Sequence, residues 1–426
     1  MTLKVEFAFC QSSFAFIIHL MKKSNVFQFS RLLVLVICSA GVWHAQAQDR
    51  AYVLCEGAQD FYSGEVLESP RIGTIDLSAS TPDFEVLRVF NGHAFAADLA
   101  LSEDGSMVYV AAEDTVYKLE AATGEILAEQ PLQGARRLLL DGDRLFVSRG
   151  DVDPMTWGSV DFDHYFVALD AGDLSWDTGW EAADNGGPGW ASEGICVSEG
   201  AVYVAINNAF TFGEEVGLIG RIDLTTGAYT ETELGPDGLN PVHLFSGDDG
   251  AVVSVNVQQY DGTSLSRWTG TSDADTEVVA DVTAGCGAAD WHEGGVLYQV
   301  YGEAGFRKAD GATLAAEEGW SGNGGSVYAM QVLSSGQVLL GTTDFATAGA
   351  VEMWDFEAGL QWSIPVGIAP GKMQVSMTAS AVQEVEGPRT IVETVDLLGR
   401  PVKSGKGMLL HLWSDGTVTK ELRLAD

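Results

Sequence analysis

The sequence predicts an all-β fold, a seven-bladed β-propeller with four-stranded blades, followed by a small β-sandwich-like C-terminal domain. Three observations lead to this prediction. The 426 residues include 50 Gly but only 11 Pro, which is typical of many short strands joined by tight turns. A short apolar strand recurs seven times along the chain. The repeat length of about 46 residues matches four strands per blade.

Each recurring apolar strand is followed by two further strands that are joined by a tight turn. Apolar and polar residues alternate with a period of two in these strands, and the turns contain Thr-Gly, Asp-Gly or Ala-Gly. The seven apolar strands occupy residues 51–57, 106–113, 143–150, 200–207, 250–257, 295–302 and 336–343. A β-helix is the alternative repeat architecture, but its repeats are much shorter.

A fourth, inner strand precedes six of the seven apolar strands and is missing before the first. These inner strands are predicted to start near His93, Ala135, Ser192, Asn240, Gly287 and Tyr328. A spare strand over 371–376 follows the seventh repeat. We expect this spare strand to complete the first blade, so that strands from both ends of residues 48–376 close the ring.

Residues 1–47 are predicted to be an export signal whose true start is Met21. A basic segment over 22–31 precedes an apolar run over 32–42, and Ala45-Gln46-Ala47 is typical of cleavage after Ala47. The apolar run is too short for a membrane span, which needs about 20 residues. The mature chain is therefore expected not to span a membrane.

The predicted propeller is strongly acidic. The whole chain has a net charge of −37, and residues 48–376 contain 13 Lys and Arg against 52 Asp and Glu. Phosphate contacts need clusters of Lys and Arg, so the charge argues against nucleic acid and anionic lipid as partners. A cation or a cationic molecule is the partner to test first.

Three cysteines, Cys55, Cys196 and Cys286, remain after the export signal. An odd number cannot be fully paired within one chain, which argues against a disulfide scaffold. Two interpretations stay open: three small buried residues, or one disulfide bridge and one free thiol.

The last 50 residues, 377–426, have their own strands and a nearly balanced charge. This segment resembles the type A C-terminal sorting domain of the type IX secretion system of Bacteroidota. The resemblance rests on Asp396, Gly399, Arg400, Gly407, Asp415 and Gly416 and on a basic closing strand at 420–424. It implies recognition by the type IX secretion machinery, passage across the outer membrane, and surface attachment or release of the protein.

The predicted propeller resembles the YncE-like (DUF5074-type) surface propellers of Bacteroidota. The matching segments are 52–77, 192–208 and 220–227, together with Asn240-Pro241. Cys55 stands where this family commonly has Asn, which puts any site carried over to that position in doubt. Some relatives bind cobalamin, so the resemblance implies a surface ligand such as a corrinoid and a TonB-dependent transporter as a partner.

Candidate ligand-binding residues lie on the long loops that join the second and third strands of a blade, or one blade to the next. Long loops on a rigid scaffold commonly carry function. The candidates are Tyr62, Trp157, Trp190, Asn207, Asn208, Phe210, Asn256 and Tyr260. The aromatic residues can stack on a ligand or pack against each other, and the asparagines can bind a ligand or stabilise turns.

Metal and catalytic signals are weaker. Asp151, Asp153, Asp161 and Asp163 share one loop and are candidate Ca²⁺ ligands, although their spacing differs from that of an EF-hand. No other cofactor is predicted. The common hydrolase, zinc-protease and redox motifs are absent.

The sequence therefore predicts a secreted or cell-surface binding module whose small-molecule or protein ligand lies on the long-loop face. Two alternatives remain. One is a metal-dependent hydrolase or lyase with a channel site around His93, Glu193 and His292. The other is an interaction scaffold in an outer-membrane assembly.

Overall fold

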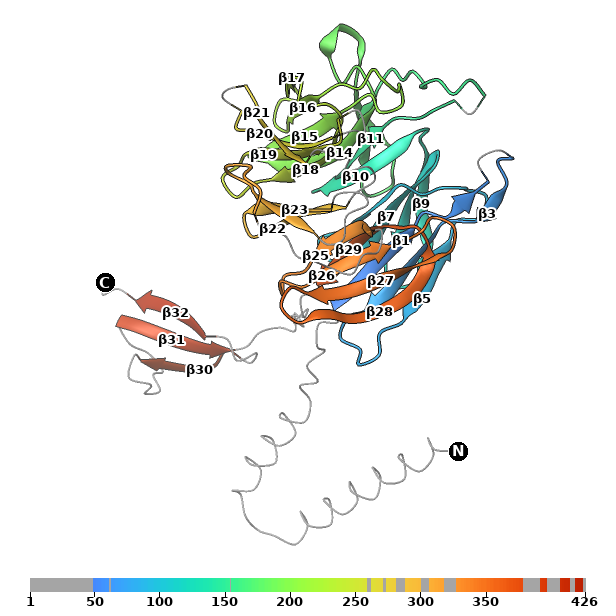
Figure 1. The fold of residues 1–426 in the computed structure, drawn as a ribbon. Coiled ribbons are helices and arrows are strands. Elements are labelled where there is room, and N and C mark those ends of the chain that lie inside the picture. Colours follow the sequence, from blue (N-terminus) through green and yellow to red (C-terminus); the bar gives the residue numbers. More distant parts are fainter. Residues whose placement is uncertain are drawn as a thin grey trace, which may run out of the picture. The chain divides into compact units, whose positions relative to one another are not determined.

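The computed structural model confirms a seven-bladed β-propeller (Figure 1). It describes residues 49–60, 63–153, 155–258, 262–270, 273–280, 288–299, 306–317, 327–377, 391–396, 407–413 and 418–423. The only helix among them is the short 3₁₀ helix η1 (Ala183–Asn185). None of these residues belongs to a helix with the length and hydropathy needed to span a membrane. The predicted export signal lies outside the described residues.

The seven blades are antiparallel sheets that follow one another along the chain. Blade 1 consists of β29 (Pro370–Met377), β1 (Asp49–Cys55), β4 (Arg71–Asp76) and β5 (Phe84–Val89). Blade 2 consists of β6 (Asp98–Leu101), β7 (Met107–Ala112), β8 (Thr115–Glu120) and β9 (Ile126–Pro131). Blade 3 consists of β10 (Ala135–Asp141), β11 (Arg144–Arg149), β12 (Phe166–Asp170) and β13 (Trp176–Trp180). Blade 4 consists of β14 (Ser192–Ser198), β15 (Ala201–Ile206), β16 (Leu218–Asp223) and β17 (Tyr229–Glu233).

The remaining three blades continue this order. Blade 5 consists of β18 (Pro241–Ser246), β19 (Val252–Asn256), β20 (Thr263–Trp268) and β21 (Asp275–Ala280). The described part of blade 6 consists of β22 (Ala289–His292), β23 (Gly295–Tyr298), β24 (Arg307–Asp310) and a bridge between Ala309 and Ala316. Blade 7 consists of β25 (Val327–Val332), β26 (Val338–Thr342), β27 (Ala348–Asp355) and β28 (Gly359–Ile368). A small hairpin, β2 (Ala58–Gln59) and β3 (Val66–Glu68), projects from blade 1.

Strands from both ends of the propeller close the ring, as predicted. The innermost strand of blade 1, β29, pairs antiparallel with β1, so that Val53 lies opposite Met373 and Asp49 opposite Met377. Strand β4 pairs with the other edge of β1. Blade 1 therefore combines residues from the first and the last segments of the domain.

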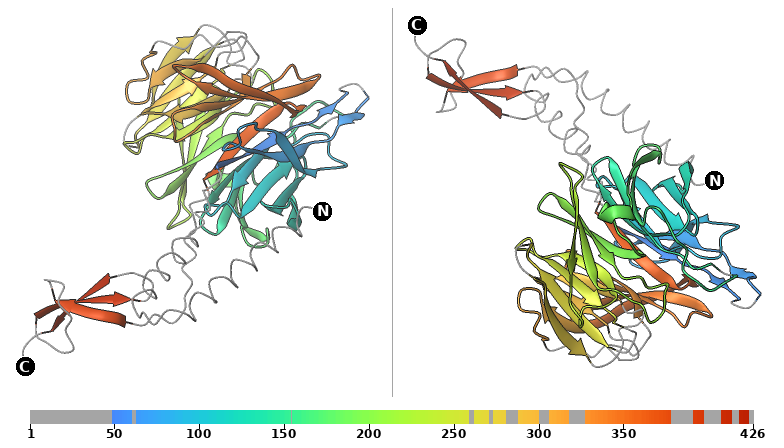
Figure 2. Two further views of the ribbon diagram at one scale, coloured as in Figure 1. Left: turned by 90° about the horizontal axis from the view of Figure 1, so that it is seen from below. Right: turned by 90° about the horizontal axis from the view of Figure 1, so that it is seen from above.

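The described residues form seven hydrophobic core clusters, one between each pair of neighbouring blades. Strand β1 illustrates how one strand serves two clusters. Tyr52 and Leu54 pack against blade 2, while Ala51 and Val53 pack against blade 7. The second strand of each blade is mostly apolar because both of its faces are buried. Figure 2 shows the sheets packed face to face around the ring.

Tight turns connect the third and fourth strands of the blades. In blade 4, the Asp223 Oδ1 atom accepts hydrogen bonds from the backbone N–H groups of Thr225 (3.1 Å) and Thr226 (2.9 Å). Gly227 follows with a φ of +72°, a conformation that favours glycine. These hydrogen bonds, of which those from Thr226 contribute most, lower the pKa of Asp223. Equivalent Asp turns begin at Asp170, Asp310 and Asp355.

One inner strand starts later than the sequence predicts. The sequence predicts an inner strand that starts near His93. This start is wrong by about five residues, because β6 begins at Asp98. The His93 ring instead contacts the Tyr117 hydroxyl at 2.7 Å and a Glu113 carboxylate oxygen at 3.3 Å. These contacts hold the chain in a turn before it enters the channel.

The residues beyond the propeller include a separate three-stranded antiparallel sheet. Its strands are β30 (Ile391–Asp396), β31 (Gly407–Trp413) and β32 (Val418–Arg423). Ala47–Ala379 form one compact unit, and this sheet belongs to another. Of the predicted sorting-motif residues, Asp396 ends β30 and Gly407 begins β31. The other four, Gly399, Arg400, Asp415 and Gly416, lie outside the described residues, and the sorting domain itself stays a prediction.

Ring closure generates a test of stability. A chain ending at Ala369 lacks β29 and leaves one edge of β1 unpaired, so we expect it to lose cooperative unfolding. A control chain ending at Met377 retains the closing strand and should keep the melting temperature of the propeller. A milder test is a single substitution in the closing strand. Met373 is 1% exposed, so Met373→Ala should lower the free energy of unfolding by about 2–5 kcal/mol. Thermal and denaturant unfolding followed by circular dichroism would measure both effects, and equal stability of the two truncated chains would contradict this account.

Candidate functional site

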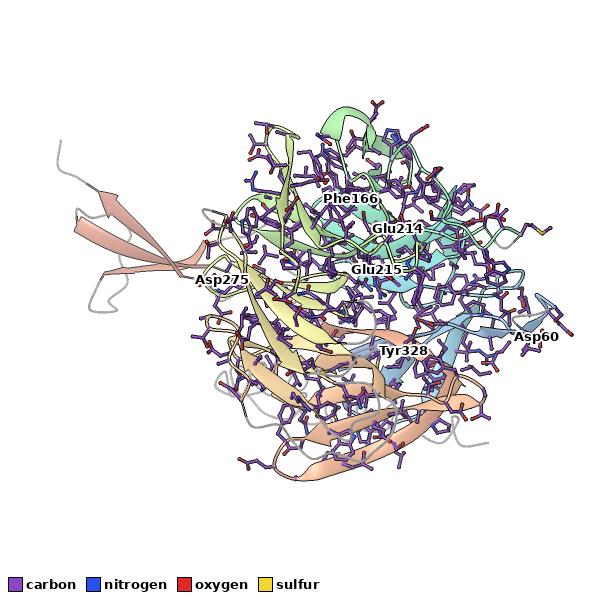
Figure 3. The ribbon with its side chains drawn as sticks, turned by 45° about the horizontal axis from the view of Figure 1, so that its top comes forward. Asp60, Phe166, Glu214, Glu215, Asp275 and Tyr328 are labelled. Carbon is purple, nitrogen blue, oxygen red and sulfur yellow. The ribbon has the colours of Figure 1, made fainter. Side chains whose placement is uncertain are left out.

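The first residues of the seven inner strands surround one opening of the central channel. A cavity of about 360 Å³ lies there, and every blade contributes to its lining. We call this site the channel mouth and define it by Glu56, Asp98, Arg136, Arg137, Glu193, Asn240, Asp290, Tyr328 and Lys372. It opens on the long-loop face, because the inner strands begin where the loops between blades end. Figure 3 labels Tyr328 near the centre of the ring and Asp60 on the projecting hairpin.

Two guanidinium groups share one buried carboxylate at the mouth. Arg136 donates to Glu193 Oε1 through Nη2 and through Nε, the latter at 3.0 Å. The Arg137 Nε atom lies 3.1 Å from Glu193 Oε2, and Arg137 Nη1 donates to the Ala97 carbonyl at 3.1 Å. Burial alone would raise the pKa of Glu193, but the two arginines outweigh it and the pKa is lowered. Glu193 is thus a buried anion held by cations from the neighbouring blade.

A second ion pair joins blades 1 and 2. Asp98 is 1% exposed, and its Oδ2 atom accepts a hydrogen bond from the Leu138 N–H at 2.9 Å. Its Oδ1 atom lies 3.4 Å from Lys372 Nζ, in the closing strand β29. Burial alone would lower the pKa of Arg137, but the charges of Glu193 and Asp98 raise it. The two ion pairs therefore form one electrostatic network across blades 1 to 4.

A buried carboxyl group with one side-chain hydrogen-bond partner among the described residues lies at the join of blades 7 and 1. Glu56 is 7% exposed, and its two carboxyl oxygens lie 2.9 Å and 2.8 Å from the Tyr328 hydroxyl. Burial raises the pKa of Glu56 to about 8, although Tyr328 and the arginines act against the rise. Gly371 packs closely against it, because a Cβ atom there would lie 2.2 Å from Glu56 Oε1 and would push the carboxyl group aside.

Asn240 places an amide group without a described partner in the lining of the mouth. The residue is fully buried, and neither its Oδ1 nor its Nδ2 atom has a hydrogen-bond partner among the described residues. Its backbone is fixed, because its N–H donates to the Val216 carbonyl at 2.8 Å and its carbonyl accepts from Val257 at 3.0 Å. Buried polar atoms are normally hydrogen-bonded, so this amide in the cavity lining is a candidate contact for a polar molecule.

Asp290 completes the set of acidic groups. Its Oδ2 atom accepts hydrogen bonds from the Val332 N–H at 2.6 Å and from Gln331 Nε2 at 3.2 Å, and its Oδ1 atom accepts one from the Trp291 N–H at 2.8 Å. Burial raises its pKa. Asp290 is therefore saturated by blades 6 and 7 and less available to a ligand than Glu56.

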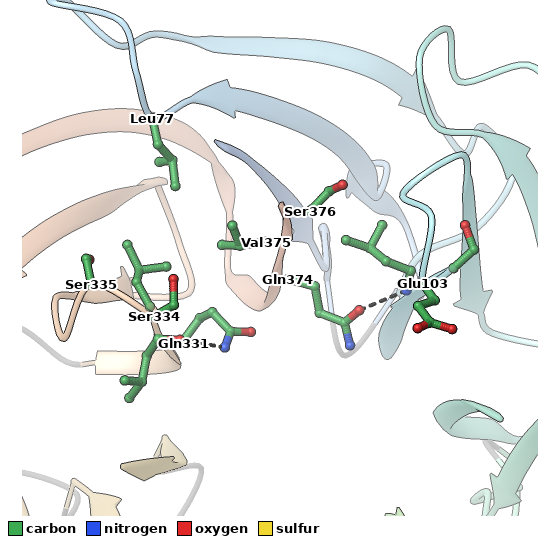
Figure 4. Close-up of a pocket in the computed structure, with 12 residues that line it drawn as sticks. Leu77, Glu103, Gln331, Ser334, Ser335, Gln374, Val375 and Ser376 are labelled. Atoms are coloured by element: carbon green, nitrogen blue, oxygen red, sulfur yellow. Dashed lines mark hydrogen bonds between the residues drawn. The ribbon is translucent and has the colours of Figure 1, made fainter. Parts of the chain in front are cut away.

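The opposite opening of the channel is chemically different. A cavity of about 470 Å³ there is lined mainly by serines, glutamines and aliphatic residues, with Glu103 as its charged residue (Figure 4). Gln374 Oε1 accepts a hydrogen bond from the Leu101 N–H at 2.8 Å. Gln331 lines both cavities. The larger cavity has fewer groups able to select a ligand, and the channel mouth is the stronger candidate site.

The structure brings only some of the predicted ligand residues to the channel mouth. Asn207 and Phe210 line the cavity, and the Arg136 guanidinium lies 5.0 Å from the centre of the Phe210 ring. Trp157 and Trp190 are 57% and 41% exposed and do not belong to the cavity lining. Tyr62 and Tyr260 lie outside the described residues.

The two remaining predicted asparagines serve local structure. Asn208 has a φ of +52°, and its Nδ2 atom donates to the Glu214 carbonyl at 2.9 Å. Asn256 donates to Ser264 and Ser266 and accepts from Ser254, inside blade 5. Both amides are used by turns and by neighbouring strands.

The predicted metal and catalytic residues are not assembled into a site. Among the described residues, no group of three or more His, Cys, Asp or Glu could hold a metal ion. Asp151 and Asp153 accept hydrogen bonds within their own loop and from Gln133. Glu193 pairs with arginines. The His292 ring packs against Phe356, and the His93 ring contacts the Tyr117 hydroxyl. Asp161 and Asp163 share the loop without forming such a group.

Cys55 and Cys196 are free, buried thiols. Burial raises the pKa of each to about 12, so neither is a reactive thiolate at neutral pH. Cys286 lies outside the described residues, and its pairing stays open.

Most of the channel mouth was not identified from the sequence. Its signal is present, since polar residues lie at or beside the start of several inner strands, at Arg136-Arg137, Ser192-Glu193, Asn240 and Lys372. In a propeller, residues at this position of each repeat converge on one axis, however far apart they lie in the sequence.

Comparisons with known proteins support the propeller fold. No protein-family model matches the chain, and no curated protein matches it. A solved structure from Bacteroides fragilis, described as a candidate 6-phosphogluconolactonase, has a TM-score of 0.52 and 14% identity, covering 78% of this chain and 99% of that chain. A functionally unknown protein from Desulfotomaculum acetoxidans has a TM-score of 0.52 and 12% identity, covering 77% and 98%. The extracellular domain of a candidate one-component system from B. thetaiotaomicron has a TM-score of 0.51 and 11% identity, covering 87% of this chain and 56% of that chain.

Glu56 generates a prediction about pH. The unfolded chain ionises this group near its ordinary pKa of 4.5, whereas the folded protein ionises it near 8. Between these values the folded state holds the extra proton, so the contribution of Glu56 to stability falls as pH rises and is fully lost above about 8. Glu56→Gln should flatten the stability profile between pH 5 and 8, and Glu199→Gln, in an exposed turn, should not. Denaturant unfolding at a series of pH values would test this, and parallel profiles for wild type and Glu56→Gln would contradict it.

Proposed function

We propose that this protein is an exported binding module that holds a small ligand at its channel mouth, on the long-loop face. The observation that carries the proposal is a cavity of about 360 Å³ into which all seven blades bring polar or charged side chains. Volumes of this order are typical of small-molecule sites. The enclosed ion pairs and the buried Asn240 amide are groups that fix the orientation of a ligand.

Several features favour binding over catalysis. The carboxylates of the mouth are held by arginines, a lysine, a tyrosine or backbone N–H groups, and the candidate catalytic histidines have separate partners. A general base needs a free lone pair near its substrate. Rigid, paired charges are better suited to orienting a ligand.

A second candidate function is protein recognition by the long loops around the mouth. Large apolar side chains are exposed there on loops of blades 1, 3 and 4: Leu67 64%, Met155 87%, Trp157 57% and Phe212 80%. Exposed aromatic and Met side chains are typical of interaction surfaces. A protein partner such as a TonB-dependent transporter would engage these loops. A corrinoid, which is larger than the cavity, would also have to lie across them.

The proposed binding site can be tested by filling it. Ala209 lines the cavity, so Ala209→Trp should occupy it and abolish the binding of small ligands. Ala183→Trp adds the same ring to an exposed position of a long loop and serves as the control. Ligand-observed NMR with a panel of sugars, amino acids, organic acids, nucleosides and corrinoids would measure binding. Binding that survives Ala209→Trp but is lost in Trp157→Ala or Trp190→Ala would move the site to the loops.

Export to the cell surface remains part of this proposal and rests on the two terminal sequence patterns. A chain translated from Met21 should be found at the cell surface or in the medium of a host with type IX secretion. The same chain without residues 377–426 should remain in the periplasm. Cell fractionation with immunodetection would measure this, and equal distribution of the two chains would contradict the sorting role.

A further inference from the structure

We infer that the channel mouth takes an uncharged, polyhydroxylated molecule with the size of a mono- or disaccharide. This inference rests on the proposed function, because it names the class of ligand for the same site. It follows from the balance of charge at the mouth, from the unpartnered Asn240 amide and from the mixture of donors and acceptors around the cavity.

The first step is the charge balance. Three of the 13 Lys and Arg residues of the propeller line this one cavity: Arg136, Arg137 and Lys372. Three acidic side chains, Asp98, Glu193 and Asp290, accompany them. Glu56 adds little charge at neutral pH, since burial raises its pKa to about 8. The described charged groups of the mouth therefore cancel, within a domain that is otherwise strongly acidic.

The second step concerns how these charges are distributed. Glu193 lies between Arg136 and Arg137, and Asp98 lies beside Lys372. An anionic ligand that approached a guanidinium would also approach the carboxylate already bound to it. A cationic ligand would meet the arginines in the same way. Removing a charged group from water without a free counter-charge is costly, so the mouth discriminates against both kinds of ion.

The third step is hydrogen bonding. The guanidinium groups offer donors, the carboxylates offer acceptors, and the Asn240 amide offers both with no described partner. A hydroxyl group is donor and acceptor at once, so a molecule with several hydroxyls can satisfy this mixed lining. Phe210 and Phe245 also line the cavity and supply apolar surface for the C–H faces of a sugar ring. The cavity volume of about 360 Å³ suits one or two such rings.

The test compares sugars that differ only in charge. Glucose, galactose, mannose, maltose and lactose would be titrated by isothermal calorimetry into the purified full-length protein at pH 7. Glucuronate and galacturonate would serve as anionic counterparts, and glucosamine and galactosamine as cationic ones. We expect at least one uncharged sugar to bind about tenfold more tightly than its charged counterparts.

Matched variants locate the binding. Asn240→Gly removes the amide and tolerates the φ of +57°, and it should weaken sugar binding about tenfold. Asn185→Gly makes the same change at an exposed residue with the same φ of +57° and should leave binding unchanged. If circular dichroism shows that Asn240→Gly is unfolded, Tyr328→Phe removes a hydroxyl at the mouth and should also weaken binding.

The outcomes separate this inference from the proposed function. Tighter binding of a charged sugar or an amino acid, weakened by Asn240→Gly, would overturn the inference while the binding site stands. Sugar binding that neither Asn240→Gly nor Tyr328→Phe weakens would place the sugar elsewhere and would also overturn it. If no sugar binds but another ligand does, and Ala209→Trp abolishes the binding of that ligand, the inference fails and the proposed function survives. If no ligand in either panel binds, both fail.

Discussion

The burial of the second strand of every blade on both of its faces is the constraint on which this structure depends. A strand such as β1 packs alternate side chains into two different clusters, so it is stable only between two neighbouring blades. No blade can satisfy this requirement alone, and a row of blades would leave an apolar face bare at each end. Closing the row into a ring removes both bare faces. The pairing of β1 with β29 supplies that closure within a single sheet.

The same constraint explains why the polar groups gather at the channel. The inner strands face the axis of the ring rather than a neighbouring sheet, so their first residues are free to be polar. At the channel mouth these residues are nonetheless buried or half-buried, and the charged ones pair with one another. Glu193 with Arg136 and Arg137, and Asp98 with Lys372, are the result. Pairs of this kind contribute little net stability, since desolvation offsets much of their attraction. Their value lies in holding a fixed arrangement of donors and acceptors.

The sequence predicted the fold well because its signals are local and repeated. Two-sided burial appears as short, mostly apolar segments such as 200–207, and the spare strand at 371–376 pointed to closure. The site was predicted less completely, because convergence on the axis is a property of the ring and not of any segment. Asn207 and Phe210 were identified from their loops, and both line the cavity. Arg136, Arg137 and Lys372 were overlooked, since each appears in the sequence as an ordinary charged residue at a strand boundary. Asn208 and Asn256 look equally polar in the sequence, yet their amides are satisfied by neighbouring groups.

Closure through β29 also affects the order in which the chain can fold as it is made. Synthesis proceeds from the N-terminus, whereas β1 needs a partner strand that ends at Met377. Until that segment has been synthesised, one edge of β1 is unpaired and the ring cannot close. Contacts of such long sequence separation form slowly. A nascent chain of this design therefore cannot complete its first blade until most of the propeller has been synthesised. The same delay exposes β1 to pairing with other chains. The last strand of the propeller thus determines when the ring can form, as well as how it is closed.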